Sequence, residues 1–142
     1  MCGALSATLE LCVEYTANRW QFNKPLNGFQ AIQQYTAVMA GELVVANAAL
    51  ELATSLVDTT HPDVSTAAAV AKARVGAAAG QIARLAHQVH GAIGFTREYP
   101  LHELTRRLWS WRDEYGNERF WCRRLGEKAR GGDVWELLTS TP

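Results

Sequence analysis

The residues best placed to do chemistry lie where a long apolar helical pattern stops. Gly91 and Gly94 follow that pattern, and Phe95 and Pro100 come shortly after them. Glycine carries no Cβ, so backbone N–H groups beside it can come close to a bound group, and amides bared at a helix end favour an anion such as a phosphate. The alternative interpretation is a glycine cap at the end of a helix, followed by an ordinary turn. The spacing alone favours that alternative, because one G-x-x-G is a weak signal.

Three histidines near the same break raise the question of a metal site. His87 and His90 are three residues apart, a spacing that can place two ligands on one face of a helix, and His102 follows them. No cluster of cysteines or carboxylates accompanies these histidines in the sequence. We therefore predict no metal site in this chain.

The composition limits the classes of partner. The chain has 142 residues, with 14 basic and 14 acidic side chains that give a formal net charge of zero. This balance argues against a nucleic-acid partner, because nucleic acids are held largely through basic surfaces. Cys2, Cys12 and Cys122 show neither a metal-binding spacing nor the even count of a disulfide framework. That usage is typical of reduced thiols in a cytoplasmic protein.

We expect no membrane-spanning segment. The N-terminus lacks the basic stretch of a signal peptide, and charged residues interrupt the apolar runs that have the length to cross a bilayer. The prediction is therefore a soluble, cytoplasmic chain with no membrane partner. The interrupting residues are Glu10, Glu14, Glu42, Glu51, Lys72 and Arg74.

Helices must position these residues, because apolar side chains recur at helical spacing along most of the chain. Pro, Asn and Gly interrupt the patterns and predict turns, and almost no segment is typical of a strand. One pattern, at 64–90, is rich in Ala and Gly and is expected at the centre, since small side chains let helices approach closely. The fold prediction is one all-α domain over 1–142, an antiparallel four-helix bundle. The predicted helices are 3–20, 29–57, 64–90, 101–115 and 117–130, with turns at 22–28, 58–62 and 91–100 and a short last turn at 134–138.

Five segments resemble the C-terminal helical domain of the acyl-CoA dehydrogenase family. Each motif is short, and their common order and separation carry the resemblance. The segments are Arg19-Trp20-Gln21-Phe22 with Lys24-Pro25, Phe29-Gln30, Ala71-Lys72, Gln88-Val89-His90-Gly91-Ala92-Ile93-Gly94-Phe95 with Glu98-Tyr99-Pro100, and Arg112-Asp113.

The resemblance implies part of an FAD enzyme. Members of this family oxidise the Cα–Cβ bond of an acyl-CoA thioester: a carboxylate base removes the α-proton, and the β-hydrogen leaves as hydride to the flavin. They form dimers or tetramers in which the bundle of one subunit completes the FAD site of its neighbour. The family's full chain also has an N-terminal helical domain and a middle β-domain, which this sequence does not show. We therefore expect activity only with those domains supplied by another chain, in a homo-oligomer or a heteromer.

The resemblance also implies a set of cofactor-binding residues. Arg19 matches an arginine that approaches the FAD diphosphate of the neighbour, and a planar, always-charged guanidinium suits phosphate. Gln30 matches a glutamine on the same cofactor, and Gln88 begins the segment that meets the adenosine diphosphate portion. The alternative is that Arg19 is an ordinary helix-end charge and that the glutamines face solvent. The implied set is Arg19, Gln21, Phe22, Gln30, Gln88, Gly91 and Gly94.

The sequence departs from the family at three positions. Asn23 replaces a glycine of the first turn, and asparagine tolerates a positive φ. Ala92 replaces the second glycine of G-G-x-G, which restricts close backbone approach. Aligned on Gly116, Tyr115 occupies the place of the base glutamate, and Glu114 lies one residue away. A tyrosine, with an ordinary pKa of about 10, is a poor base, and a slip of one helical residue rotates a side chain by roughly 100°.

The catalytic base is therefore unassigned, and Glu114 is a weak candidate for it. Some branches of the family carry the glutamate on an earlier helix, and others form heteromers in which only one subunit has the base. The alternative function is a non-catalytic helical protein that kept the family bundle for oligomerisation or for interaction with a partner.

Overall fold

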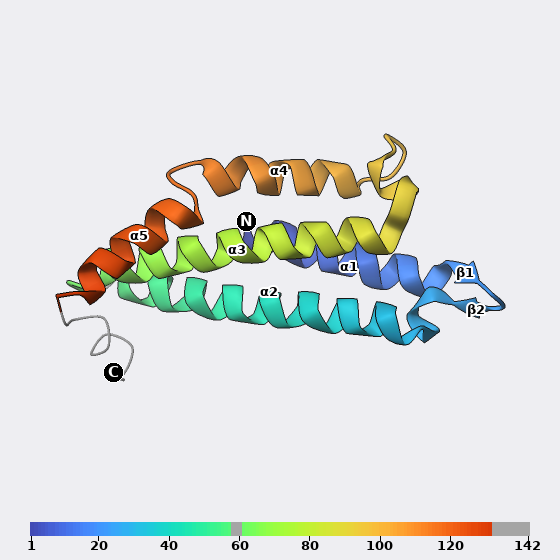
Figure 1. Ribbon diagram of the computed structural model, residues 1–142, viewed down its shortest axis with the longest axis horizontal. Helices are drawn as coiled ribbons and strands as arrows, with labels where there is room; N and C mark the ends of the chain where they lie inside the picture. Colours follow the sequence, from blue (N-terminus) through green and yellow to red (C-terminus); the bar gives the residue numbers. More distant parts are fainter. Residues whose placement is uncertain (58–60, 132–142) are drawn as a thin grey trace.

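The computed structural model describes residues 1–57 and 61–131, and these form an all-α bundle, which confirms the predicted fold class (Figure 1). Four helices pack together, and a fifth packs along the first half of the third. The short last turn predicted at 134–138 lies outside the described residues. The helices are α1 (Cys2–Asn18), α2 (Gln30–Val57), α3 (Val64–His90), α4 (Leu101–Asp113) and α5 (Glu118–Ala129).

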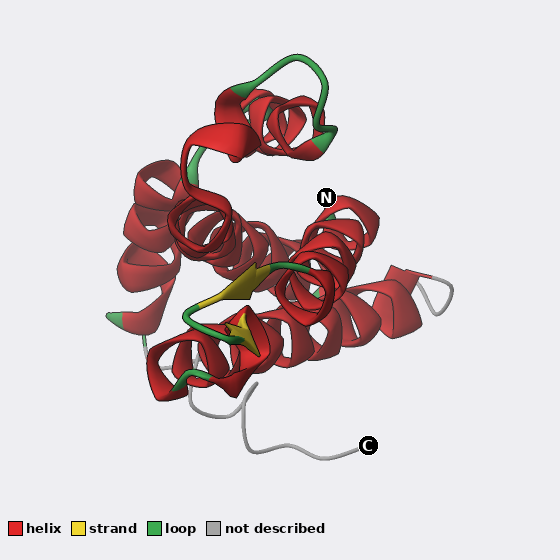
Figure 2. Ribbon diagram, turned by 90° about the vertical axis from the view of Figure 1, so that its right-hand side faces the viewer, coloured by secondary structure: helices red, strands yellow, loops and turns green. Residues whose placement is uncertain are grey.

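The Ala-rich helix α3 lies at the centre of the bundle, as its small residues predict, and packs against α1, α2, α4 and α5 (Figure 2). Its alanines let the neighbouring helices approach closely, so the neighbours contribute most of the larger core side chains. Leu5 of α1, Met39 of α2 and Leu108 of α4 are fully buried in the same cluster as Ile82 of α3. Burying each of these side chains stabilises the fold by roughly 1.5–3 kcal/mol.

A small β-hairpin overlaps the turn predicted at 22–28 and begins two residues before it, and the sequence analysis did not predict it. β1 (Trp20–Gln21) pairs antiparallel with β2 (Lys24–Pro25), and the 3-10 turn η1 (Leu26–Gly28) leads into α2. Phe22 and Asn23 have φ angles of 51° and 62°, the positive values that two-residue hairpin loops favour. Asn23 therefore makes the turn in place of the family's glycine. Strands of two residues carry no alternating pattern, which is why they escaped prediction.

Two helices end two residues earlier than predicted. α1 ends at Asn18 instead of residue 20 because Trp20 enters β1. α4 ends at Asp113 instead of residue 115 because Tyr115 and Gly116 take φ angles of 58° and 94°, which a right-handed helix excludes. The loop predicted at 91–100 contains the 3-10 turn η2 (Gly91–Phe95).

The expectation that charged residues interrupt every apolar run of membrane-spanning length is wrong for α2. Within 1–57 and 61–131, it is the one helix long and apolar enough to cross a membrane, by length and composition only. Core helices of soluble proteins share that length and composition. The buried residues of α2 are Met39, Ala46 and Ala53, so much of its apolar surface faces away from the bundle.

Candidate functional site

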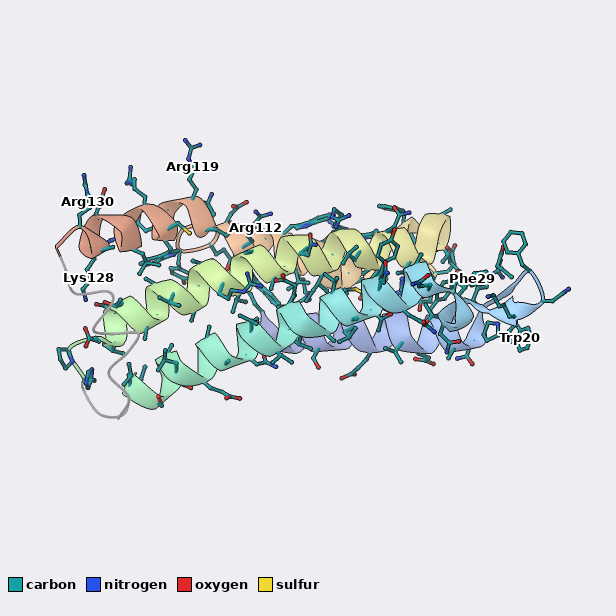
Figure 3. The ribbon with its side chains drawn as sticks, turned by 60° about the horizontal axis from the view of Figure 1, so that its bottom comes forward. Trp20, Phe29, Arg112, Arg119, Lys128 and Arg130 are labelled. Carbon is teal, nitrogen blue, oxygen red and sulfur yellow. The ribbon has the colours of Figure 1, made fainter. Side chains whose placement is uncertain are left out.

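An open groove lies at the hairpin end of the bundle, which Trp20 and Phe29 mark in Figure 3. Its volume is about 610 Å³, and residues of α1, the hairpin, α2 and the turn after α3 border it. Leu26, Ile32 and Ile93 give it a mostly apolar lining. Apolar walls with a few polar groups are typical of sites that take a ring or a nucleotide.

The groove brings together five of the seven residues predicted to bind the cofactor. The Arg19 side chain is exposed and has no ion-pair partner within the two described ranges. An unpaired guanidinium at the edge of an apolar groove suits an anionic group. The five residues that line the groove are Arg19, Gln21, Phe22, Gln88 and Gly91.

Gly91 caps the end of α3, which was the alternative interpretation of the glycine pattern. Its φ of 63° and ψ of −141° lie in a region that favours glycine. Its N–H donates to the carbonyl of His87, so this amide is not free to bind a phosphate. Among the residues that line the groove, Arg19 carries the permanent positive charge.

Gly94 and Gln30 lie outside the groove lining. Gly94 is buried, and a Cβ added there would lie 3.0 Å from Cβ of His90 and 3.0 Å from Cδ2 of Leu101. Glycine is therefore needed for η2 to pack against α3 and α4. Gln30 is exposed at the first residue of α2. The cofactor contacts of these two residues stay predictions.

His90 forms a wall of the groove that the sequence analysis did not assign to the cofactor site. Its Nδ1 lies 2.8 Å from the carbonyl oxygen of Ala86, so this nitrogen carries the proton, and its Nε2 accepts from the Tyr99 hydroxyl at 3.1 Å. Tyr15 stacks on the ring, with centroids 4.4 Å apart. Burial lowers the pKa of His90 and raises the pKa of the adjacent Cys12 thiol to about 12. The wall is therefore uncharged near neutral pH.

His87 has partners separate from those of His90. Its Nε2 lies 2.9 Å from Oγ1 of Thr105, whose hydroxyl donates to the carbonyl of Leu101, so Nε2 is the donor. The ring stacks on Phe95, with centroids 4.2 Å apart. Across the part of the chain that the structure describes, no group of three His, Cys, Asp or Glu residues is placed to hold a metal ion.

The family's base position lies in the turn between α4 and α5. Tyr115 has a φ of 58°, and its side chain is 90% exposed. Glu114 is also exposed, and its Oε1 accepts from the Ser110 hydroxyl one helical turn earlier. Nε1 of Trp121 donates to the Tyr115 carbonyl and fixes the backbone of the turn. Among the described residues, both side chains therefore point away from the packed interior.

Lys72 holds this turn in place from α3. Its Nζ donates to the carbonyls of Trp111, Arg112 and Gly116, at 3.1, 2.8 and 3.0 Å. Two of these carbonyls belong to the last turn of α4, where a helix leaves them without partners. Burial lowers the pKa of Lys72, while the nearby carboxylate of Glu118 acts in the opposite direction. All three N–H groups of the amine are used, so Lys72 is a clamp.

Two glycines of α3 make room for an ion pair across the same turn. Arg112 at the end of α4 pairs through Nε with Oε1 of Glu118 at the start of α5. A Cβ on Gly76 would lie 3.0 Å from Cγ of Glu118, and one on Gly80 would lie 3.2 Å from Nη1 of Arg112. The ion pair therefore packs against α3 where two glycines leave the helix without side chains, and it joins α4 to α5.

The groove lies at the C-terminal end of α3, whereas the α4–α5 turn packs against the first half and the middle of that helix, as the labelled Phe29 and Arg112 show in Figure 3. Between Lys72 and Gly91 the helix rises roughly 28 Å, at about 1.5 Å per residue. The side chain of Tyr115 or Glu114 therefore does not reach a group bound in the groove of the same chain. Within the described residues, one copy therefore presents the groove and the α4–α5 turn as two separate surfaces.

One protein family matches most of the chain: the family described as "Acyl-CoA dehydrogenase, C-terminal domain" matches residues 1–127. Acryloyl-CoA reductase (NADH) from Anaerotignum propionicum is 35% identical over 104 residues, which are 73% of this chain and 26% of that protein. Acyl-CoA dehydrogenase IpdE2 from Mycobacterium tuberculosis is 30% identical over 139 residues, which are 94% of this chain and 39% of that protein. The chain thus spans less than two fifths of the length of these relatives.

Solved structures share the fold. A variant of the Tcur3481-Tcur3483 steroid ACAD matches with a TM-score of 0.88 and 26% identity, over 94% of this chain and 37% of that chain. A FAD-dependent dehydrogenase matches with a TM-score of 0.83 and 24% identity, over 90% of this chain and 34% of that chain, and it shows the fold alone. The family match, the relatives and the bundle agree. This chain belongs to the acyl-CoA dehydrogenase family and corresponds to its C-terminal helical domain.

Proposed function

We propose that this chain is the C-terminal domain of an FAD-dependent acyl-CoA dehydrogenase and that its groove completes a flavin nucleotide site with domains from another chain. One observation carries the proposal: Gln88, far from Arg19 and Gln21 in the sequence, converges with them on one open groove at the hairpin end. Family membership and the fold shared with a FAD-dependent dehydrogenase support FAD as the nucleotide.

The side chains of the groove fit the adenosine diphosphate portion of FAD. Arg19 brings a permanent positive charge with planar donors, which suits a diphosphate. The amide groups of Gln21 and Gln88 both donate and accept, as sugar and phosphate oxygens require. Phe22 is 86% exposed at the groove edge and offers an apolar face for a ring. The uncharged wall at His90 leaves the charge of Arg19 unopposed.

Bound FAD supplies the hydride acceptor for oxidation of an acyl-CoA thioester. This chain would anchor the nucleotide end of the cofactor through Arg19 and would exclude water from it through the apolar lining. We assign proton abstraction to the chain that brings the other domains, because Tyr115 stands at the base position and lies far from the groove. The two-component name of the Tcur3481-Tcur3483 relative supports such an assembly.

The proposed substrate class is an acyl-CoA thioester, since both curated relatives are named for acyl-CoA chemistry. The proposal includes a cytoplasmic location, which the three free cysteines, Cys2, Cys12 and Cys122, support.

The test is a nucleotide titration by isothermal calorimetry, with FAD and with ADP. Arg19→Gln should weaken binding by about tenfold or more, because a charge-assisted hydrogen bond contributes roughly 1.5–3 kcal/mol. Arg107→Gln, on the exposed face of α4, is the matched control and should bind as the parent chain does. Equal binding by the two variants, or no binding by the parent chain, would remove the support for this groove as the cofactor site.

A second candidate function is a non-catalytic helical protein that serves association. The exposed Tyr115 in place of a carboxylate base and the exposed apolar surface of α2 favour it. Stable self-association with no nucleotide binding, measured on the same sample, would select this second function over the first.

A further inference from the structure

A second pocket lies between α3 and α5, away from the hairpin end. Its volume is about 340 Å³, and its walls come from residues within 65–69 of α3 and 121–128 of α5. We name it the α3–α5 pocket. Small-molecule sites typically have volumes of roughly 300–1,000 Å³, so the pocket has room for a small ligand. It shares no lining residue with the groove of the proposed FAD site, so a ligand here is independent of nucleotide binding.

The pocket exists because α5 lies on α3 without sealing against it. Across α5, all of which the structure describes, no residue is buried, and Trp121 and Leu125 are half-buried where they border the pocket. On the α3 side, Ala68 and Ala69 contribute only methyl groups. Protein interiors normally close such gaps by packing. Small side chains opposite a large aromatic one therefore leave a flat slot that a ring can enter.

Contacts within the chain hold both ends of the slot. Nε1 of Trp121 donates to the carbonyl of Tyr115 at 3.0 Å, which fixes the indole. At the other end, Lys128 reaches from α5 toward the start of α3 (Figure 3). Its Nζ lies 3.5 Å from Oδ1 of Asp63 and donates to Oγ1 of Thr66, a residue that is 3% exposed. A pocket whose walls are already fixed costs a ligand little ordering.

The pocket has one more positive than negative side chain. Lys128 is balanced by Asp63, whereas Arg124 has no ion-pair partner among residues 1–57 and 61–131. Cζ of Arg124 lies 5.8 Å from the ring centroid of Trp121 and 5.7 Å from that of Phe120, within the cation–π range of about 6 Å. The guanidinium therefore lies beside the aromatic wall, where its planar donors can meet a carboxylate.

We propose that the α3–α5 pocket binds a small aromatic carboxylate. The ring lies in the slot between Trp121 and Ala68, and the carboxylate accepts hydrogen bonds from Arg124 and from the hydroxyl of Ser65 at the same pocket. One negative charge balances the charge of Arg124, and a flat ring gains stacking contact with the indole. A neutral ring would leave the guanidinium unpaired, and a bare anion would leave the slot empty. Both parts of the ligand are therefore required.

The first test is a titration of the purified chain with naphthalene carboxylate, followed by amide chemical shifts and by calorimetry. The shifts should change at 65–69 and 121–128. Naphthalene carboxamide, the uncharged analogue, should bind at least about tenfold more weakly, because it lacks the charge-assisted hydrogen bonds to Arg124. Equal affinity for the two probes would overturn the anion contact. No binding, or shifts confined to 19–32 and 86–95, would overturn the α3–α5 pocket as the site.

The second test assigns the two parts of the ligand to residues. Arg124→Gln should weaken the binding of naphthalene carboxylate by about tenfold or more. Arg119→Gln is the matched control, because Arg119 is an exposed arginine of the same helix that points away from α3 (Figure 3). It should bind as the parent chain does.

A pair of alanine variants tests the slot. Ala68→Leu should fill the slot and weaken the binding of both probes, whereas Ala77→Leu, at an exposed position of α3 outside the pocket, should bind as the parent chain does. Circular dichroism should show that all four variants remain folded. Equal effects of a variant and its control would overturn the assignment of that part of the pocket.

Discussion

The hairpin end of this bundle and the α4–α5 turn differ in how their polar groups are paired. At the α4–α5 turn, Lys72 donates to three carbonyls and Arg112 pairs with Glu118, so the main polar groups are satisfied within the chain. At the hairpin end, Arg19 has no ion-pair partner in the described ranges and borders an open groove. The polar groups of the turn are paired within the chain, whereas the groove is open and its guanidinium is unpaired among the described residues. The residues of the hairpin end match the family's motifs, whereas Tyr115 stands at the position of the family's base glutamate.

The largest expected effect on stability comes from removing the Lys72 amine that holds the α4–α5 turn. Lys72→Met leaves the carbonyls of Trp111, Arg112 and Gly116 without their donor, so the free energy of unfolding should fall by about 3 kcal/mol. Lys24→Met is the control from the hairpin end: its Nζ donates to a single exposed carbonyl, that of Gly28, and the loss should stay below about 1 kcal/mol. Urea unfolding measures both. Equal losses would show that Lys72 is not a clamp.

A pair of glycine variants compares the stability of the α4–α5 turn with that of the turn after α3. Gly116→Ala meets both a φ of 94° and a contact of 2.6 Å with Cδ1 of Phe120, so it should cost about 2–3 kcal/mol of stability. Gly91→Ala meets a φ of 63° in open space, so strain alone remains, at about 1–2 kcal/mol. The difference in unfolding free energy between the two variants is the measurement. If Gly91→Ala cost more, the turn after α3 would be the more tightly packed of the two.

The smallest effect is a pH dependence at the hairpin end. Burial lowers the pKa of His87 and of His90, so the unfolded chain binds more protons than the folded chain below an ordinary histidine pKa of about 6.5. Stability should be full above that pH and should fall as the pH drops below it, with a slope of at most about 1.4 kcal/mol per pH unit for each histidine.

Unfolding midpoints between neutral and mildly acidic pH test this dependence. His90→Phe should reduce the slope, because it removes one of the two buried groups. A slope that His90→Phe does not alter would assign the pH dependence to other groups.

Helical periodicity was sufficient to predict the bundle and the central place of α3, because those depend on the spacing of small and apolar side chains. The hairpin at Trp20 to Pro25 was missed because two paired residues give no period, and only the φ angles of Phe22 and Asn23 reveal it. The early end of α4 was missed because Lys72 and Trp121 hold the carbonyls of Gly116 and Tyr115 from other helices, and periodicity does not show such contacts.

The site was predicted in part for a related reason. Motif order identified Arg19 and Gln88, and the fold brings them to one groove. The sequence did not show that the Gly91 N–H donates to the His87 carbonyl, or that His90 and Leu101 occupy the space beside Gly94. Both facts depend on backbone geometry. The wall of Tyr15 and His90 was missed because its members lie in two different helices.

The most direct test of the central claim is hydrogen–deuterium exchange of the whole chain with and without saturating FAD. The account predicts slower exchange in the hairpin and start of α2, residues 19–32, and around the end of α3, residues 86–95. It predicts no change in the α4–α5 turn, residues 111–118. Protection confined to 111–118, or no protection anywhere while FAD is bound, would contradict the assignment of the nucleotide site to the hairpin end.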